Sequence, residues 1–198
     1  MASLLNAQTA RFLDDLKKKR LITPIERVLL PSPQTGWIIL SCADGDRFGD
    51  LFDHHRRTCV DGDRCLHPFT CHGGAIALPR HSPLAVSGKR QASVTDFMLD
   101  HIQAATEIKG LDKVALYFHF PCAAIGRAGL SEQEVVHLAV EAKQLIKAEV
   151  PAVKQVVSFV HVDSGTDKRT YKLHLKKIIA EPAIFPSLNL EAGAMATA

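Results

Sequence analysis

The stretch Val114-Ala115-Leu116-Tyr117-Phe118-His119-Phe120-Pro121-Cys122 starts with apolar and aromatic residues and ends with an imidazole and a thiol. An unbroken apolar run of this length is typical of a strand buried on both faces, as in a parallel sheet. A second such run, Trp37-Ile38-Ile39-Leu40, precedes the cluster Ser41-Cys42-Ala43-Asp44-Gly45-Asp46-Arg47. Open α/β sheets bind ligands outside the carboxyl ends of their strands. If the two strands lie side by side, Cys42 and His119, 77 positions apart, meet at one site.

Helices are predicted before and after the strand at residues 114–118. Ser93 is placed to cap a helix that ends at Gly110, the usual C-terminal glycine position. Ser131 and Glu134 have the spacing of a capping box ahead of another amphipathic helix. A third helix is expected over residues 3–20, where apolar residues recur at close to helical spacing.

The C-terminal half is predicted to contain a hairpin. Residues 156–162 are apolar and β-branched, residues 163–166 permit a reversal, and residues 171–175 alternate between apolar and polar. The segment 44–83, in contrast, is expected to be rich in loops. This order of elements predicts an α/β fold, with a mainly parallel central sheet flanked by helices and an antiparallel C-terminal edge hairpin.

Length and composition predict one domain. The chain has 198 residues, of which 46% are hydrophobic, enough for one core of ordinary size. We assign residues 1–180 to this domain, with residues 1–30 as an N-terminal helical arm. Residues 181–198 carry prolines and a run of small residues, and we expect a weakly ordered tail there.

The charge and cysteine content narrow the class of partner. A net charge of +3 comes from 24 basic and 21 acidic residues that are mostly interspersed, which does not favour nucleic acid. No stretch approaches the roughly 18–20 apolar residues of a membrane span. Five cysteines are an odd number for a disulfide framework and suit a reducing compartment. We therefore expect a cytoplasmic protein with no nucleic-acid or membrane partner.

The two clusters at the strand ends supply metal ligands. Cys42, His119 and Cys122 offer two thiolates and one imidazole, the ligand set of a zinc ion that keeps a fourth position open. Each cysteine alone is more often a small buried hydrophobe, and Asp44 with Arg47 can be a simple loop salt bridge. Their joint position after two buried strands favours a catalytic metal site.

These motifs, in this order, resemble the β-class carbonic anhydrases. That family has a Cys-x-Asp cluster followed by arginine, then a glycine-rich turn, then His-x-x-Cys after a strand, and the resemblance covers about residues 37–175. It implies that Cys42, His119 and Cys122 bind Zn²⁺. It also makes Asp44 a possible fourth ligand in a closed form of the site.

The resemblance further implies an activity, which is reversible hydration of carbon dioxide to bicarbonate by zinc-bound hydroxide. Asp44 and Arg47 would form the catalytic pair. Gly73 and Gly74, in a turn that is similar to the family's glycine-containing segment, would let the main chain approach the substrate. A homodimer or higher homo-oligomer is expected on the same grounds, as is a small-molecule substrate.

The chain departs from the family pattern in its spacing. Gly45-Asp46 separates Asp44 from Arg47, one residue more than the family has, so Asp46 is an alternative partner for Arg47. The apolar Phe120-Pro121 favours an alternative to carbon dioxide hydration, in which the protein is a zinc hydrolase of carbonyl sulfide or carbon disulfide. A further alternative is that the chain is a non-catalytic zinc-binding relative with a structural or binding role.

The remaining cysteines are evenly spaced. Cys59, Cys65 and Cys71 are six positions apart, with His67 and His72 nearby. They can bind a second metal or remain free thiols, and they lack the Cys-x-x-Cys knuckle of structural zinc sites.

Overall fold

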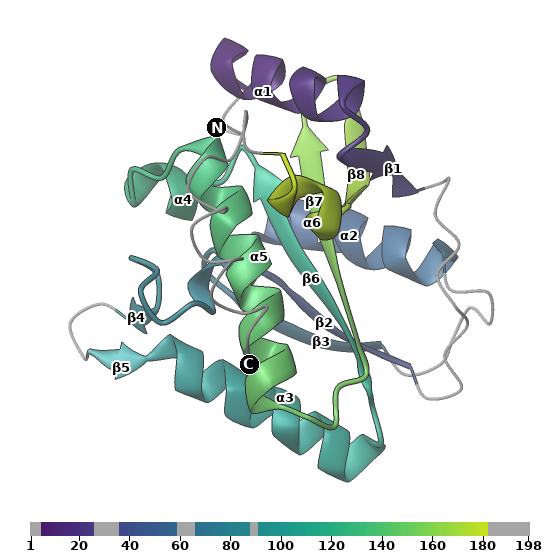
Figure 1. Ribbon diagram of the computed structural model, residues 1–198, viewed down its shortest axis with the longest axis vertical. Coiled ribbons are helices and arrows are strands. Elements are labelled where there is room, and N and C mark those ends of the chain that lie inside the picture. The colour runs from purple at the N-terminus through teal and green to yellow at the C-terminus, as the bar shows by residue number, and fades with distance from the viewer. Residues whose placement is uncertain (1–4, 26–35, 59–65, 88–90, 182–198) are drawn as a thin grey trace.

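The computed structural model describes residues 5–25, 36–58, 66–87 and 91–181. Within these ranges the main sheet has six strands in the order β1-β8-β7-β6-β2-β3 (Figure 1). Their bounds are β1 Ile22–Pro24, β2 Trp37–Cys42, β3 Leu66–Cys71, β6 Lys113–Phe120, β7 Gln155–Asp163 and β8 Lys168–Leu173. The four strands β3, β2, β6 and β7 are parallel, and β8 and β1 are antiparallel to their neighbours. A second, small sheet pairs β4 (Val86–Ser87) with β5 (Ala92–Ser93).

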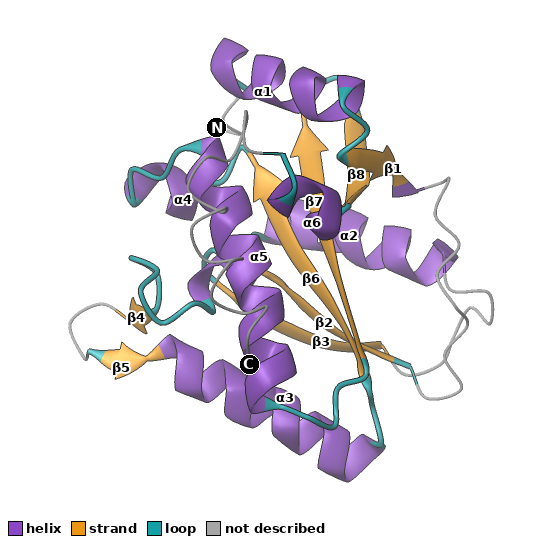
Figure 2. Cartoon of the chain, viewed as in Figure 1, coloured by secondary structure: helices purple, strands orange, loops and turns teal. Residues whose placement is uncertain are grey.

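Helices cover both faces of the main sheet (Figure 2). Helices α3 (Val94–Lys109) and α5 (Glu132–Glu149) pack on one face, where Ile102 and Ile146 meet Ile38 and Leu116. Helix α2 (Gly45–Thr58) packs on the opposite face. The predicted fold class, a mainly parallel sheet flanked by helices with an antiparallel edge hairpin, is confirmed.

Capping groups place the ends of α3 and α5. The Ser93 side chain accepts a hydrogen bond from the backbone N–H of Asp96, and Gly110 ends α3 with φ at 66°. Ser131 and Glu134 form the predicted capping box at the start of α5. Both helices therefore begin where local sequence signals place them.

Segment 44–83 is more ordered than expected. It contains α2, β3 and a 3₁₀ helix at Gly74–Ala77. The apolar face of α2 is short and is interrupted by glycine and charged residues, with Phe48 and Phe52 in ring contact and Leu51 buried. Strand β3 carries a proline at position 68, which an edge strand tolerates. The loop-rich expectation for this segment is wrong, because Phe48, Leu51 and Phe52 recur at helical spacing in α2 and β3 pairs with β2 along its whole length.

The N-terminal helix belongs to the core. Helix α1 (Ala7–Lys18) buries Phe12, Leu13 and Leu16 in a cluster that also contains Val162 and Tyr171. The side chains of Thr9 and Gln8 donate hydrogen bonds to Glu132 at the start of α5. Strand β1 then pairs with β8. The described part of the expected helical arm is thus packed on its own chain, and residues 26–30 lie outside the described residues.

Two short helices complete the structure, α4 (Ala123–Arg127) and α6 (Leu175–Ile179). Of the expected C-terminal tail, residues 182–198 lie outside the described residues. No helix among the described residues is long and apolar enough to cross a membrane.

Candidate metal centre

The three predicted metal ligands converge at the carboxyl ends of neighbouring strands. Cys42 is the last residue of β2, His119 lies near the end of β6, and Cys122 follows β6. Strands β2 and β6 pair in parallel, with Leu40 opposite Leu116. The two sulfur atoms and the imidazole nitrogen of the cluster lie within 4.8 Å of one another, and all three residues are buried. A 77-residue separation in sequence is closed by the parallel pairing of two strands.

The His119 ring is oriented as a ligand. Its Nδ1 donates a hydrogen bond to the carbonyl oxygen of Pro121 at 2.8 Å, across a cis Phe120–Pro121 peptide bond. This assigns the proton to Nδ1 and leaves the lone pair on Nε2, which is buried and has no hydrogen-bond partner among the described residues. A metal-binding histidine has this arrangement, with one nitrogen fixed by a carbonyl and the other directed at the ion.

The two thiols share one proton in the metal-free protein. Their sulfur atoms are 4.0 Å apart. The hydrogen bond from Cys42, together with the backbone N–H groups of Ile125 and Ala124, lowers the pKa of Cys122 to about 7. The same hydrogen bond and burial raise the pKa of Cys42 to about 12. At pH 7 Cys122 is therefore about half deprotonated while Cys42 keeps its proton, and the amides at the start of α4 stabilise the thiolate of Cys122.

Asp44 and Arg47 do pair despite the extra residue between them. The carbonyl of Asp44 accepts the N–H groups of Arg47 and Phe48, so Asp44 leads into the first turn of α2. Residues three apart on a helical turn face each other, and Arg47 Nη1 lies 2.9 Å from Asp44 Oδ2. The same Oδ2 is 3.8 Å from His119 Nε2, which places the pair next to the ligand cluster. The side chain of Asp46 lies outside the described residues.

A second carboxylate contacts Arg47, and the sequence reasoning missed it. Asp163, the last residue of β7, places Oδ2 3.4 Å from Arg47 Nη2. The signal was present, because Asp163 ends an apolar strand at the same edge of the sheet as His119. The sequence pattern predicts only a turn at residues 163–166.

The turn that contains Gly73 and Gly74 contacts Cys42, one of the candidate metal ligands. Gly73 has φ at +85°, and its N–H donates to Cys42 Sγ at 3.4 Å. Gly74, with φ at +58°, is pressed against the ends of β2 and β6, where an added Cβ would lie 2.6 Å from the backbone atoms Cys42 N and Tyr117 O. The two glycines therefore let one turn approach the strand ends closely enough to hold Cys42. Their contact with a substrate stays a prediction.

Cys71 lies outside the cluster, although it is opposite Cys42 in the β2–β3 register. Its thiol donates to the carbonyl of Gly74 at 3.6 Å and contacts Met98 sulfur at 3.8 Å. Burial raises its pKa to about 11. Cys59 and Cys65 are outside the described residues, so the second-metal alternative is not tested as a whole.

His67 and His72, the histidines of the second-metal alternative, do not form a metal-ligand group with Cys71 among the described residues. His67 stacks on His101 and lies near Lys109, and His72 is exposed. Across the described ranges, the group Cys42, His119 and Cys122 is the only one with metal-ligand geometry.

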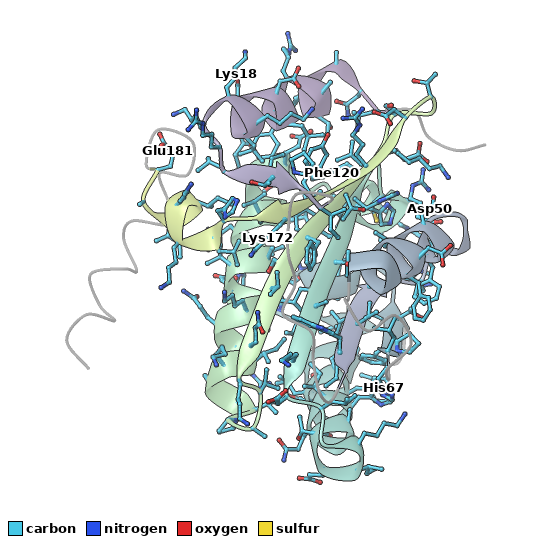
Figure 3. All side chains as sticks on the ribbon, turned by 90° about the vertical axis from the view of Figure 1, so that its right-hand side faces the viewer. Lys18, Asp50, His67, Phe120, Lys172 and Glu181 are labelled. Atoms are coloured by element: carbon cyan, nitrogen blue, oxygen red, sulfur yellow. The ribbon has the colours of Figure 1, made fainter. Side chains whose placement is uncertain are left out.

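Apolar side chains surround the sulfur atoms. The core cluster that includes Cys42 and Cys122 also includes Phe118, Phe120 and Ile125. Figure 3 labels Phe120 at the end of β6 and Asp50 on the neighbouring α2.

Comparison with known proteins gives structural matches only. No protein-family model matches the chain, and no curated protein matches it. The β-carbonic anhydrase CafD of Aspergillus fumigatus is similar with a TM-score of 0.41 and 11% identity over 77% of this chain and 97% of that chain. Carbonic anhydrase from Streptococcus mutans gives a TM-score of 0.42 and 13% identity over 84% and 99%.

A third similar structure is the carbonic anhydrase from Glaciozyma antarctica. Its TM-score is 0.38, with 13% identity over 85% of this chain and 96% of that chain. The β-carbonic anhydrases among these structures belong to the family that the sequence motifs resemble.

Proposed function

We propose that this chain is a zinc enzyme of the β-carbonic-anhydrase type, which hydrates carbon dioxide reversibly to bicarbonate. The observation that carries the proposal is the lone pair of His119 Nε2, buried and without a partner in the described structure, within 4.8 Å of two thiol sulfur atoms. An unpartnered buried nitrogen is costly unless something binds it. Two cysteines and one histidine suit Zn²⁺ with an open fourth position.

The residues present fit zinc, and each has a role. Bound zinc lowers the pKa of a coordinated water towards ~7 and so supplies a nucleophile at neutral pH. Cys42, His119 and Cys122 hold the ion, and the carbonyl of Pro121 fixes the imidazole. Arg47 holds the Asp44 carboxylate beside the ligand atoms, where it can accept a hydrogen bond at the reacting centre.

Asp44 has a second role in the proposal. Its Oδ2 is close enough to the cluster to become the fourth ligand in a closed form if Arg47 releases it. The Asp44–Arg47 contact at 2.9 Å removes the spacing argument that favoured a non-catalytic relative. Gly73 and Gly74 are proposed to border the substrate as well as to support Cys42.

A zinc hydrolase of carbonyl sulfide or carbon disulfide is the second candidate. Its supporting observation is the apolar cluster that contains the two cysteines together with Phe118, Phe120 and Ile125, and this cluster is compatible with both candidates. Carbon dioxide and these two molecules are all linear and uncharged, so the apolar residues do not separate them. Release of sulfide by the zinc-loaded protein, with no hydration of carbon dioxide, would select the second candidate.

The test of the proposal compares two cysteines. Cys122→Ala removes a ligand, so we expect less than one zinc per chain and loss of stopped-flow hydration of carbon dioxide. Cys71→Ala is the matched control, because Cys71 is partly buried on the adjacent strand and lies outside the cluster. It should keep both zinc and rate. Full retention of zinc and rate by Cys122→Ala would overturn the proposal.

The proposal extends to assembly and compartment. We propose one domain over residues 1–180, which forms a homodimer or higher homo-oligomer, and sedimentation at micromolar concentration tests this. A monomer would contradict it. Two ligand thiolates must stay reduced, which suits the cytoplasm.

A further inference from the structure

Arg47 is held at two ends by two carboxylates. Nη1 contacts Asp44 at 2.9 Å, and Nη2 contacts Asp163 at 3.4 Å. The Arg47 side chain is only 6% exposed, so water cannot replace either contact freely. Its Nε is buried and lacks a hydrogen-bond partner among the described residues. The two carboxylates are therefore what fixes the plane of the guanidinium.

Asp163 is itself held in place by the backbone. Its Oδ1 accepts the N–H of Gly165 at 2.8 Å, in the turn between β7 and β8. One carboxylate oxygen thus fixes the rotation of the group, and the other faces Arg47. Asp163 is attached to the sheet, whereas Asp44 is in the segment that leads into α2.

Loss of the Asp163 contact would leave Arg47 with Asp44 as its one described anchor. The guanidinium could then turn about its last bond and loosen its hold on Asp44. Asp44 Oδ2 is already 3.8 Å from His119 Nε2, so a freed carboxylate lies beside the ligand atoms. The geometry points to Asp163 as a positioning residue, which keeps Arg47 oriented so that Asp44 stays off the metal position.

This inference rests on the proposed function only for its effect on rate. Asp163→Asn keeps an oxygen for the Gly165 N–H and removes the charge that faces Arg47. With Co²⁺ in place of zinc, the absorption spectrum reports which donor occupies the fourth position. We expect Asp163→Asn to bind one Co²⁺ per chain with the spectrum of Arg47→Ala, which differs from the wild-type spectrum.

The rate should follow the spectrum. Loss of a charge-assisted contact of this kind corresponds to about tenfold or more in rate. We expect this fall in kcat for carbon dioxide hydration, with KM nearly unchanged, because the contact does not reach the substrate.

Lys168→Met is the matched control. Lys168 Nζ contacts Asp50 Oδ2 at 2.8 Å, so this ion pair also joins the β7–β8 hairpin to α2. The described ion pair of Lys168 does not involve Arg47, although Lys168 is opposite Asp163 in the strand register. The control should show the wild-type spectrum and kcat. If Lys168→Met changes the spectrum as Asp163→Asn does, Asp163 acts only by holding the two elements together, and the inference fails.

A second variant covers the case in which Asp163→Asn does not fold. Arg47→Lys keeps the charge but cannot span both carboxylates, and it should give the same changed spectrum. A wild-type spectrum for Asp163→Asn, or for Arg47→Lys when the first variant does not fold, overturns the inference. If wild-type protein binds Co²⁺ but hydrates no carbon dioxide, the proposed function fails while the spectra still decide the role of Asp163.

Discussion

The two faces of the central sheet differ in the kind of side chain that they bury. Under α3 and α5 the core cluster is apolar, as at Ile102 and Leu116. Towards α2 the sheet also buries His119, His161 and Thr170, which occupy neighbouring register positions on β6, β7 and β8. His161 Nδ1 and Thr170 Oγ1 are hydrogen-bonded at 2.9 Å.

The imidazole and the Arg47 guanidinium of the candidate site come from the α2 side, whereas Cys42 and Cys122 belong to an apolar core cluster. Apolar burial is worth roughly 25 cal/mol per Å² and needs no exact partner, so the α3/α5 face can stabilise the fold alone. Buried polar groups cost free energy unless each is paired. Arg47, His119 and His161 are buried on the α2 side, next to the candidate metal centre, whereas Glu132 and Ser158 are buried polar groups elsewhere in the fold.

The largest expected effect is on the apolar face. Ile102→Ala should lower the free energy of unfolding by about 2–5 kcal/mol, because it leaves a cavity at a fully buried position. Zinc content should stay at one per chain, since none of the three proposed ligands is on this helix. Chemical denaturation and metal analysis measure the two quantities.

The same helix supplies the control. Ile108 is 80% exposed, and Ile108→Ala should change the free energy of unfolding by less than about 0.5 kcal/mol. Loss of zinc from folded Ile102→Ala protein would contradict the expectation that this side of the sheet affects stability but not zinc binding.

A smaller effect on the free energy of unfolding is expected at Gly74, where a substitution should affect both stability and zinc binding. Gly74→Ala should destabilise by about 2 kcal/mol or more, because the backbone has positive φ and the new Cβ would overlap Cys42 N and Tyr117 O. It should also weaken zinc binding by displacing the turn that donates to Cys42. Thermal unfolding and a competitive zinc titration check both.

Gly129→Ala is a control that separates the cost of a positive φ from the cost of atomic overlap at the new Cβ. Gly129 has a similar φ of +69°, but no atom lies within 4 Å of an added Cβ. It should cost only about 1 kcal/mol and leave zinc affinity unchanged. Equal effects of the two substitutions would mean that the close approach of Gly74 has no role in the site.

The smallest expected effect is the pH dependence of zinc binding. With the pKa of Cys42 near 12 and that of Cys122 near 7, binding zinc as two thiolates releases about one proton between pH 8 and pH 10. The apparent affinity should therefore rise about tenfold per pH unit in this window. Below pH 7 the rise should be steeper, because Cys122 must also lose a proton.

Zinc titration calorimetry in buffers of different ionisation enthalpy counts the protons released. Cys71→Ala should reproduce the wild-type count, because that thiol does not ligate. A count near zero at pH 8 would mean that Cys42 is already a thiolate. The inference that the two thiols retain one proton between them would then be wrong.

Local sequence signals were sufficient for much of the fold and for the ligand set. Ser93 and the Ser131–Glu134 capping box act within one turn, and the apolar runs that become β2 and β6 follow from burial alone. Once two buried strands are recognised, the rule for parallel sheets places Cys42 and His119 at one edge. These features depend on neighbours in sequence or on one general rule of topology.

The tertiary structure alone decided the rest, because the groups involved meet only after folding. The first turn of α2 is what lets Arg47 reach Asp44 across the extra residue. The contact of Arg47 with Asp163 joins residues from opposite halves of the chain. Gly74 owes its role to backbone atoms of two other strands. Sequence specified which groups can bind a metal, and three-dimensional packing set how those groups are held.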